Sequence, residues 1–250
     1  MTAVNTENSE ERSFPRITWV DTLRGLAIVL MMVYHFAYDL SHFGWYDSDV
    51  GGRSAWLPFR YLILTMFISL MAISVNLSHR AGFRPKPCAI WLFKVGGCAL
   101  LVSFGTSLQF THSWVYFGIL HFMVVASLVV LLLRPYALVS LLLGVAIVVT
   151  HWVDIWVTDI LPYGWPISYI KHWFHGGRSV DFVPMVPWMG VALIASGVSL
   201  KLVALERVQS WVSKLPSFLT FFGRHSLLIY MIHQPIFFGI LYSVKYLFSL

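Results

Sequence analysis

The chain has 250 residues, of which 58% are hydrophobic and 11% are charged, and its formal net charge is +6. Soluble domains carry about 25% charged residues, so this composition excludes a soluble globular protein and indicates a polytopic membrane protein. In a membrane protein the distribution of Lys and Arg indicates which loops lie in the cytoplasm. The positive net charge therefore does not predict a nucleic-acid partner.

The first sixteen residues differ from the rest of the chain because they are polar, with Glu7, Glu10, Glu11 and Arg12 among them. An acidic segment without a cleavage site predicts a flexible cytoplasmic tail rather than a signal peptide. Residues 17–250 are then expected to form a single transmembrane domain.

Apolar segments of about 20 residues, or a little fewer, follow the tail, and each suits a helix that crosses a membrane. The predicted fold class is an all-α, polytopic membrane bundle with about seven spans, which are Trp19–Leu40, Trp56–Leu77, Ala89–Leu108, Val115–Leu133, Tyr136–Trp156, Pro184–Leu202 and Ser226–Phe248. With the N-terminus in the cytoplasm, most of the 17 Lys and Arg residues lie on the cytoplasmic side, as the positive-inside rule requires. The lipid bilayer is therefore the first partner that the sequence predicts.

The first span carries four ionisable side chains. At about 100° per residue, Asp21, Arg24, His35 and Asp39 share one narrow stripe of the helix, whereas the other faces are apolar. Ionisable groups in membrane helices are costly and usually face a bundle interior or a watery cavity. The stripe therefore predicts a functional site, in which His35 and Asp39 lie one turn apart and can form an ion pair. Asp21 and Arg24 also have a structural interpretation, because near a helix start Asp can cap and Arg can extend to the interface.

The last span has a polar face of its own. Ser226, Tyr230 and His233 follow i, i+4, i+7 spacing, which places them on one side of a helix. His233 comes shortly before Pro235, which removes a backbone hydrogen bond and kinks the helix. His233 is thus either a functional group or a structural histidine bonded to the loosened backbone.

Other polar residues in the apolar segments leave two interpretations open. His121, in the fourth span, suits either a site or an interhelical hydrogen bond. Asp181, before the sixth span, either reaches the outer site or serves as a helix-start acid. His172 and His175 have an HxxH spacing without a third ligand in view, so no metal is predicted.

Four stretches of the chain resemble one bacterial membrane-protein family, which is grouped with the catalytic domain of heparan-alpha-glucosaminide N-acetyltransferase. The first stretch runs from Arg16 to Leu40 and includes Asp21-Thr22-Leu23-Arg24-Gly25-Leu26-Ala27, followed by His35-Phe36 and Asp39. The others are residues 117–121 (FGILH), 181–188 (DFVP and PW) and 223–235 (GRHSLLIY and HQP). The resemblance covers almost the whole chain after the tail.

This resemblance implies that residues 17–250 are a transmembrane acyltransferase-like domain of the bacterial inner membrane. Acyl-CoA, with acetyl-CoA as the simplest donor, would be presented from the cytoplasm. The acceptor would be a sugar hydroxyl or amine of an envelope carbohydrate on the outer side, and a histidine would serve as base or acyl carrier. No bound cofactor is implied beyond the CoA thioester, which is a substrate.

The candidate residues can supply this chemistry. Acyl transfer from a thioester needs a base or nucleophile, for which His35 is the catalytic candidate, and Asp39 can orient its imidazole. Arginines suit the phosphates of CoA, and Tyr230 and His233 suit the developing oxyanion. The full set of substrate-binding candidates is Arg24, Asp21, His121, Asp181, Tyr230, His233 and Arg224.

Two other classes of function remain open on the sequence. A haem-binding electron carrier would use histidine pairs from different helices, and His35, His121, His151 and His233 are available. A permease or exporter would use the polar stripe as a proton or solute path, without consuming acyl-CoA. The sequence also leaves open whether the protein forms a homo-oligomer.

Overall fold

The computed structural model of the protein describes residues 17–47, 50, 55–79, 82–110, 112–153, 179–203 and 206–248. Within these ranges every regular element is a helix and no strand occurs. The elements are α1 (Thr18–His42), α2 (Trp56–Ser78), α3 (Pro85–Gln109), α4 (Ile119–Leu133), α5 (Ala137–Val153), α8 (Met185–Val203), α9 (Glu206–Val212), α10 (Ser217–Arg224) and α11 (Ser226–Phe248). The predicted tail and the HxxH pair of His172 and His175 lie outside the described residues.

Four of these helices, α1, α2, α3 and α11, are long and apolar enough to cross a membrane. The helices α4, α5 and α8 are also apolar but shorter. Each of the seven predicted segments therefore coincides with a helix. The described part of the chain is an all-helical membrane bundle, whereas the count of seven spans and the orientation of the N-terminus stay predictions.

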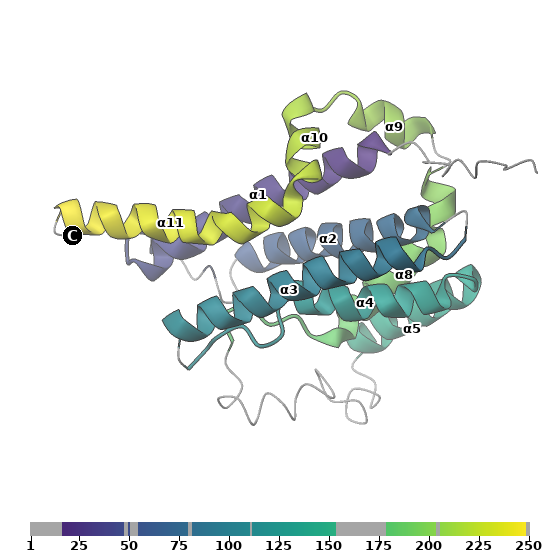
Figure 1. The fold of residues 1–250 in the computed structure, drawn as a ribbon, viewed down its shortest axis with the longest axis horizontal. Coiled ribbons are helices and arrows are strands. Elements are labelled where there is room, and N and C mark those ends of the chain that lie inside the picture. Colours follow the sequence, from purple (N-terminus) through teal and green to yellow (C-terminus); the bar gives the residue numbers. More distant parts are fainter. Residues whose placement is uncertain are drawn as a thin grey trace, which may run out of the picture.

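The main hydrophobic core lies where α1, α2, α4 and α8 meet (Figure 1). Its most deeply buried side chains are Ala27, Ile28, Ile68, Ala72, Phe122, Ala126, Val130, Val183, Ala192 and Leu193. Small side chains such as these alanines let apolar helices approach closely, which is how helices associate in a bilayer. This core fixes α1 and α2 relative to each other and so provides the frame for the polar residues of α1.

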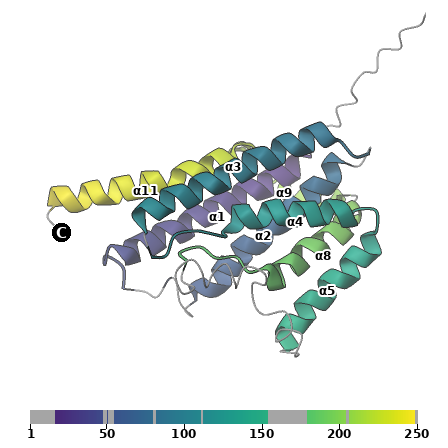
Figure 2. The ribbon, with the colours of Figure 1, turned by 60° about the horizontal axis from the view of Figure 1, so that its bottom comes forward.

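The outer helices are attached to this core in different ways. Figure 2 shows α3 and α11 along one edge of the bundle and α5 beside α8 at the opposite edge. The α5–α8 contact depends on glycines, because a Cβ atom on Gly144 would lie 2.7 Å from the carbonyl oxygen of Gly190. A Cβ atom on Gly197 would likewise lie 2.8 Å from the carbonyl oxygen of Ala137. Such close backbone approach is typical of membrane helix pairs.

Two short helices that the sequence analysis did not predict, α9 and α10, lie between α8 and α11. Helix α10 crosses α1 at a backbone contact (Figure 1). A Cβ atom on Gly25 would collide with the carbonyl group of Leu219, and one on Gly223 with the carbonyl group of Asp21. Next to this contact, the hydroxyl groups of Thr22 and Thr220 share a hydrogen bond of 2.8 Å. The crossing therefore determines where α11 begins beside α1.

Candidate active site

Two histidines meet where α11 packs along α1 (Figure 1). The ring centroids of His35 and His233 are 5.1 Å apart, with the ring planes at 60°. His35 lies ten residues after Gly25, and His233 lies ten residues after Gly223. Gly223 lies in α10, which crosses α1 at Gly25, and α11 then begins at Ser226 and packs along α1, where it reaches the turn that carries His35. The sequence could not tell which histidine accompanies His35; the structure identifies His233.

The hydrogen bond of His233 determines which of its nitrogens is available. Nδ1 lies 2.7 Å from the carbonyl oxygen of Tyr230, and a carbonyl can only accept, so Nδ1 carries the hydrogen. In the neutral ring, Nε2 then holds a lone pair, and this buried atom has no partner within the described ranges. His233 therefore makes the backbone hydrogen bond that is expected of a structural histidine. The same bond leaves Nε2 without a partner in the α1–α11 interface.

Asp39 is fully buried in the same interface. Its Oδ1 accepts a hydrogen bond of 3.2 Å from Nε2 of Gln234, while its Oδ2 and Oε1 of Gln234 have no partner among the described residues. The predicted contact between Asp39 and His35 is not observed. In the described part of the chain, no hydrogen bond or ion pair joins these two side chains. Gln234 was not among the predicted site residues. The feature of the sequence that could have indicated it is a polar amide next to His233 in an otherwise apolar helix.

Arg60 on α2 is a second residue that the sequence analysis did not select. Its Nη2 donates a hydrogen bond of 3.1 Å to the carbonyl oxygen of Phe182 and lies 3.7 Å from Oδ1 of Asp181. Arg60 is also close enough to His35 to act on it electrostatically. This ion pair attaches Asp181 to α2, and a role for Asp181 at the outer site stays a prediction.

His121 differs from the other histidines because both of its ring nitrogens are engaged. The backbone N–H of Gly118 donates to Nδ1 at 3.3 Å, so Nε2 carries the hydrogen and donates to Oγ of Ser103 at 3.2 Å. The Ser103 hydroxyl donates in turn to the carbonyl oxygen of Val115. His121 thus connects the start of α4 to α3, which is the interhelical alternative that the sequence left open. Asp181 also lies at this helix start, since a Cβ atom on Gly118 would be 2.9 Å from its Oδ2.

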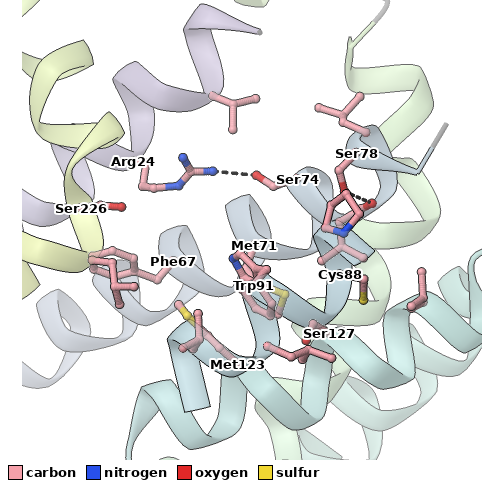
Figure 3. A pocket seen from close by; sticks show the side chains of 18 of the residues that line it. Arg24, Phe67, Met71, Ser74, Ser78, Cys88, Trp91, Met123, Ser127 and Ser226 are labelled. Carbon is pink, nitrogen blue, oxygen red and sulfur yellow. Dashed lines mark hydrogen bonds between the residues drawn. The ribbon is translucent and has the colours of Figure 1, made fainter. Parts of the chain in front are cut away.

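The other half of the polar stripe lies near the N-terminal end of α1. Nη1 of Arg24 is 2.8 Å from Oδ1 of Asp21, and its Nη2 donates to Oγ of Ser74 at 2.7 Å (Figure 3). Nε of Arg224, just before α11, is 3.9 Å from Oδ2 of Asp21. Asp21 therefore lies between two guanidinium groups and joins α1 to the α10–α11 junction.

A cavity of about 670 Å³ opens beside these charges, between α1, α2, α3, α4 and α11. Its lining changes along its length. Near the N-terminal end of α1 it is polar, with Asp21, Arg24, Ser74, His79, Arg84 and Arg224; farther in, it is lined by Phe67, Trp91, Val95, Leu120, Met123 and Tyr230 (Figure 3). The cavity thus has a charged mouth and a mainly apolar interior.

Tyr230 connects this cavity to the histidine pair. Its side chain lines the inner end of the cavity. Its ring centroid is also 5.7 Å from that of His233, which contacts His35. A molecule that fills the cavity therefore ends within one side chain of the two imidazoles.

The described residues contain no group of three or more His, Cys, Asp or Glu side chains that could hold a metal ion. Cys88 and Cys98 are both free thiols.

Comparisons with known proteins place these features in a family. No curated protein and no solved structure matched the chain. The sequence model of the family described as heparan-alpha-glucosaminide N-acetyltransferase, catalytic, matches residues 16–235, a range that begins just before α1 and ends two residues after His233. Membership in this family indicates a membrane transferase of the acetyltransferase type. The protein belongs to the heparan-alpha-glucosaminide N-acetyltransferase catalytic family.

Proposed function

We propose that the protein is a seven-span acyltransferase of the bacterial inner membrane with its N-terminus in the cytoplasm. It moves an acyl group, acetyl in the simplest case, from cytoplasmic acyl-CoA to a hydroxyl or amine of an envelope carbohydrate on the outer side. The observation that carries this proposal is the position of Tyr230, which borders both the cavity and the histidine pair.

The lining of the cavity supports a CoA thioester as the donor. In the proposed orientation its charged mouth faces the cytoplasm, where Arg24, Arg84 and Arg224 can pair with phosphates. The apolar interior suits the slender pantetheine arm and the acyl group. The cavity volume of about 670 Å³ lies within the range of roughly 300–1,000 Å³ that is usual for ligand pockets.

The two histidines support a two-step transfer. We assign the acyl group to His35, whose ring makes no hydrogen bond within the described part of the chain. Its imidazole attacks the thioester carbonyl, the C–S bond breaks, and the CoA thiolate leaves with the electron pair. The acceptor oxygen or nitrogen then attacks the acyl carbon, its proton passes to Nε2 of His233, and the bond to His35 breaks. The proton gained by His233 balances the one that the CoA thiolate takes up from water.

Neighbouring residues stabilise the charges that develop. The Tyr230 hydroxyl, at the inner end of the cavity, donates to the oxyanion of the tetrahedral intermediate. Asp39 lies one turn beyond His35 on the same helix, and Gln234 holds its carboxylate in place. Arg60 and Asp181 lie on the acceptor side of the histidines and contribute polar groups for the carbohydrate.

The haem alternative receives no support from the histidine geometry. His35 and His233 contact each other ring to ring, which leaves no space for a porphyrin between them. His121 is bonded through both nitrogens to Gly118 and Ser103. A bis-histidine haem site would need ring nitrogens that are free to bind iron.

The proposal is tested with purified protein in proteoliposomes that enclose amino sugars and envelope glycans. Labelled acetyl-CoA is added outside, and both free CoA thiol and enclosed labelled acceptor are measured. We expect the two products in equal amounts from the wild type and neither from His35→Ala. Movement of unmodified acceptor across the membrane without thiol release would identify a permease and contradict acyl transfer.

A further inference from the structure

His79 is a buried side chain in the cavity wall that the proposed reaction does not use. It directly follows α2 and is 5% exposed. Its Nδ1 lies 2.9 Å from both the carbonyl oxygen of Val75 and Oγ of Ser78; because the carbonyl can only accept, Nδ1 carries the hydrogen. Its Nε2 is buried and has no hydrogen-bond partner among the described residues. A buried nitrogen without a partner costs stability, so a ligand in the cavity is a natural partner for it.

Arg84 lines the same mouth of the cavity and differs from the other two arginines there. Arg24 and Arg224 both lie beside the carboxylate of Asp21. No ion pair to Arg84 occurs in the described part of the chain, and its side chain is exposed. Arg84 therefore keeps an uncompensated positive charge at the entrance, which favours an anionic ligand.

Contacts of Gly82 and Phe83 with His79 connect it to Arg84. The backbone N–H of Gly82 donates to the carbonyl oxygen of His79 at 2.9 Å, and Gly82 adopts φ of +124°, a conformation that favours glycine. The ring of His79 stacks on Phe83, with centroids 5.6 Å apart and planes at 17°. Since Arg84 follows directly, the turn presents an imidazole edge and a guanidinium at one side of the mouth.

We propose that His79 and Arg84 form a phosphate site that binds the nucleotide end of the donor. The identity of this ligand rests on the proposed function. A singly protonated phosphate donates its O–H to the lone pair of Nε2, while Arg84 donates to the other phosphate oxygens. Because the site lies at the entrance, it is assigned to the phosphate farthest from the thioester, the 3′-phosphate of CoA.

This site specifies the class of donor. A free CoA thioester presents a 3′-phosphate at the cavity entrance, whereas dephospho-CoA and a carrier-protein thioester lack this group. The protein is therefore expected to select free CoA thioesters by an interaction at the opposite end of the donor from the reacting carbonyl.

The test compares the binding of CoA and dephospho-CoA to the full-length protein in phosphatidylcholine nanodiscs, by calorimetry. The His79→Asn variant keeps an amide hydrogen near the position of Nδ1 and removes Nε2, whereas His79→Gln keeps an amide near Nε2 and removes the bond to Val75. Arg84→Gln removes the guanidinium. Lys86→Gln is the matched control, since Lys86 lies on the same segment and does not line the cavity.

We expect the wild type and Lys86→Gln to bind CoA at least about tenfold tighter than dephospho-CoA, as one charge-assisted contact allows. His79→Asn and Arg84→Gln should bring this ratio close to one, and His79→Gln should keep part of it. If His79→Asn prefers CoA over dephospho-CoA as strongly as the wild type does, the proposal is overturned, because discrimination then does not require Nε2. A second result would also overturn the proposal. If the wild type binds CoA and dephospho-CoA equally, and phosphatidylglycerol raises its unfolding temperature but not that of Arg84→Gln, the site binds a lipid phosphate.

These results separate the phosphate site from the proposed reaction. CoA binding requires neither an acyl group nor an acceptor, so a His79-dependent ratio without any acyl transfer would support the site and contradict the reaction. Acyl transfer by a His79→Asn protein that still discriminates against dephospho-CoA would support the reaction and contradict the site.

Discussion

Gly25 and Gly223 face each other so closely that neither position has space for a Cβ atom. The contact brings α10 onto α1, and α11 begins directly afterwards at Ser226, seven residues before His233, which meets His35. Two glycines near one end of the stripe therefore determine the meeting of two histidines near the other. This relationship makes the site sensitive to residues that are far from the proposed chemistry.

Substitution of Gly25 by Ala is expected to destabilise the protein, because the added Cβ meets the carbonyl group of Leu219. Overpacking of this kind typically costs about 1–3 kcal/mol, and the rigid backbone on both sides favours the upper part of that range. Thermal unfolding in detergent measures the change. The control is Gly239→Ala on α11, where a Cβ atom meets nothing within 4 Å. Equal unfolding temperatures for the two variants would show that the crossing is not tight.

The Asp39–Gln234 pair predicts an asymmetry between single and double variants. Gln234→Leu leaves the buried Asp39 carboxylate without its donor and should destabilise the protein by roughly 1–3 kcal/mol or more. Asp39→Asn keeps an oxygen that can accept from Gln234 and should cost less. The double variant Asp39→Leu/Gln234→Leu should recover part of the loss, because no polar group is left unpaired. Additive losses in a double-mutant cycle would contradict the pairing.

Tyr230→Phe separates donor binding from chemistry. Loss of one oxyanion donor usually lowers kcat by roughly 10²–10³-fold, and we expect a decrease of this order here. The affinity for CoA should hardly change, because the phenyl ring still fills the inner end of the cavity. Steady-state kinetics together with CoA binding check both parts. An unchanged kcat would remove the hydroxyl from the mechanism.

His121→Ala is expected to weaken the fold and spare the reaction. The variant loses the bonds to Gly118 and Ser103, and interhelical hydrogen bonds in membranes contribute roughly 0.6–1.7 kcal/mol each. Activity per folded molecule should stay near that of the wild type. The informative comparison is His233→Ala, which should retain a folded protein and lose transfer. A His121→Ala protein that folds normally but is inactive would place His121 in the mechanism.

Helical periodicity was sufficient to group Asp21, Arg24, His35 and Asp39 on one stripe, because a single helix fixes the relative directions of its own side chains. It could not supply their partners. Ser74, Arg224 and Gln234 come from other helices, and their positions depend on how those helices pack. The pairing of Asp39 with Gln234 instead of His35 shows this limit, since an i,i+4 spacing makes a contact feasible without selecting it.

Helices α9 and α10 were missed for a related reason. Both helices are too short to appear as a long apolar segment in the sequence. Helix α10 positions α11 through a contact between Gly223 and α1, and such a contact cannot be recognised before the helices are packed. The cavity could not be predicted from the sequence either, because its wall combines residues from six helices. The polar faces of the first and last spans were predicted separately, and only packing joins them into one site.

The most direct test of the account measures acetyl-CoA consumption and CoA binding in the same nanodisc preparations of wild type, His35→Asn and His233→Asn, with a panel of amino sugars and envelope glycans as acceptors. We expect all three proteins to bind CoA in the cavity with similar affinity. Only the wild type should release free thiol and form acylated acceptor. Acceptor acylation at the wild-type rate by either folded variant would show that this histidine does not take part, and would contradict delivery of the acyl group from the cavity to the histidine pair.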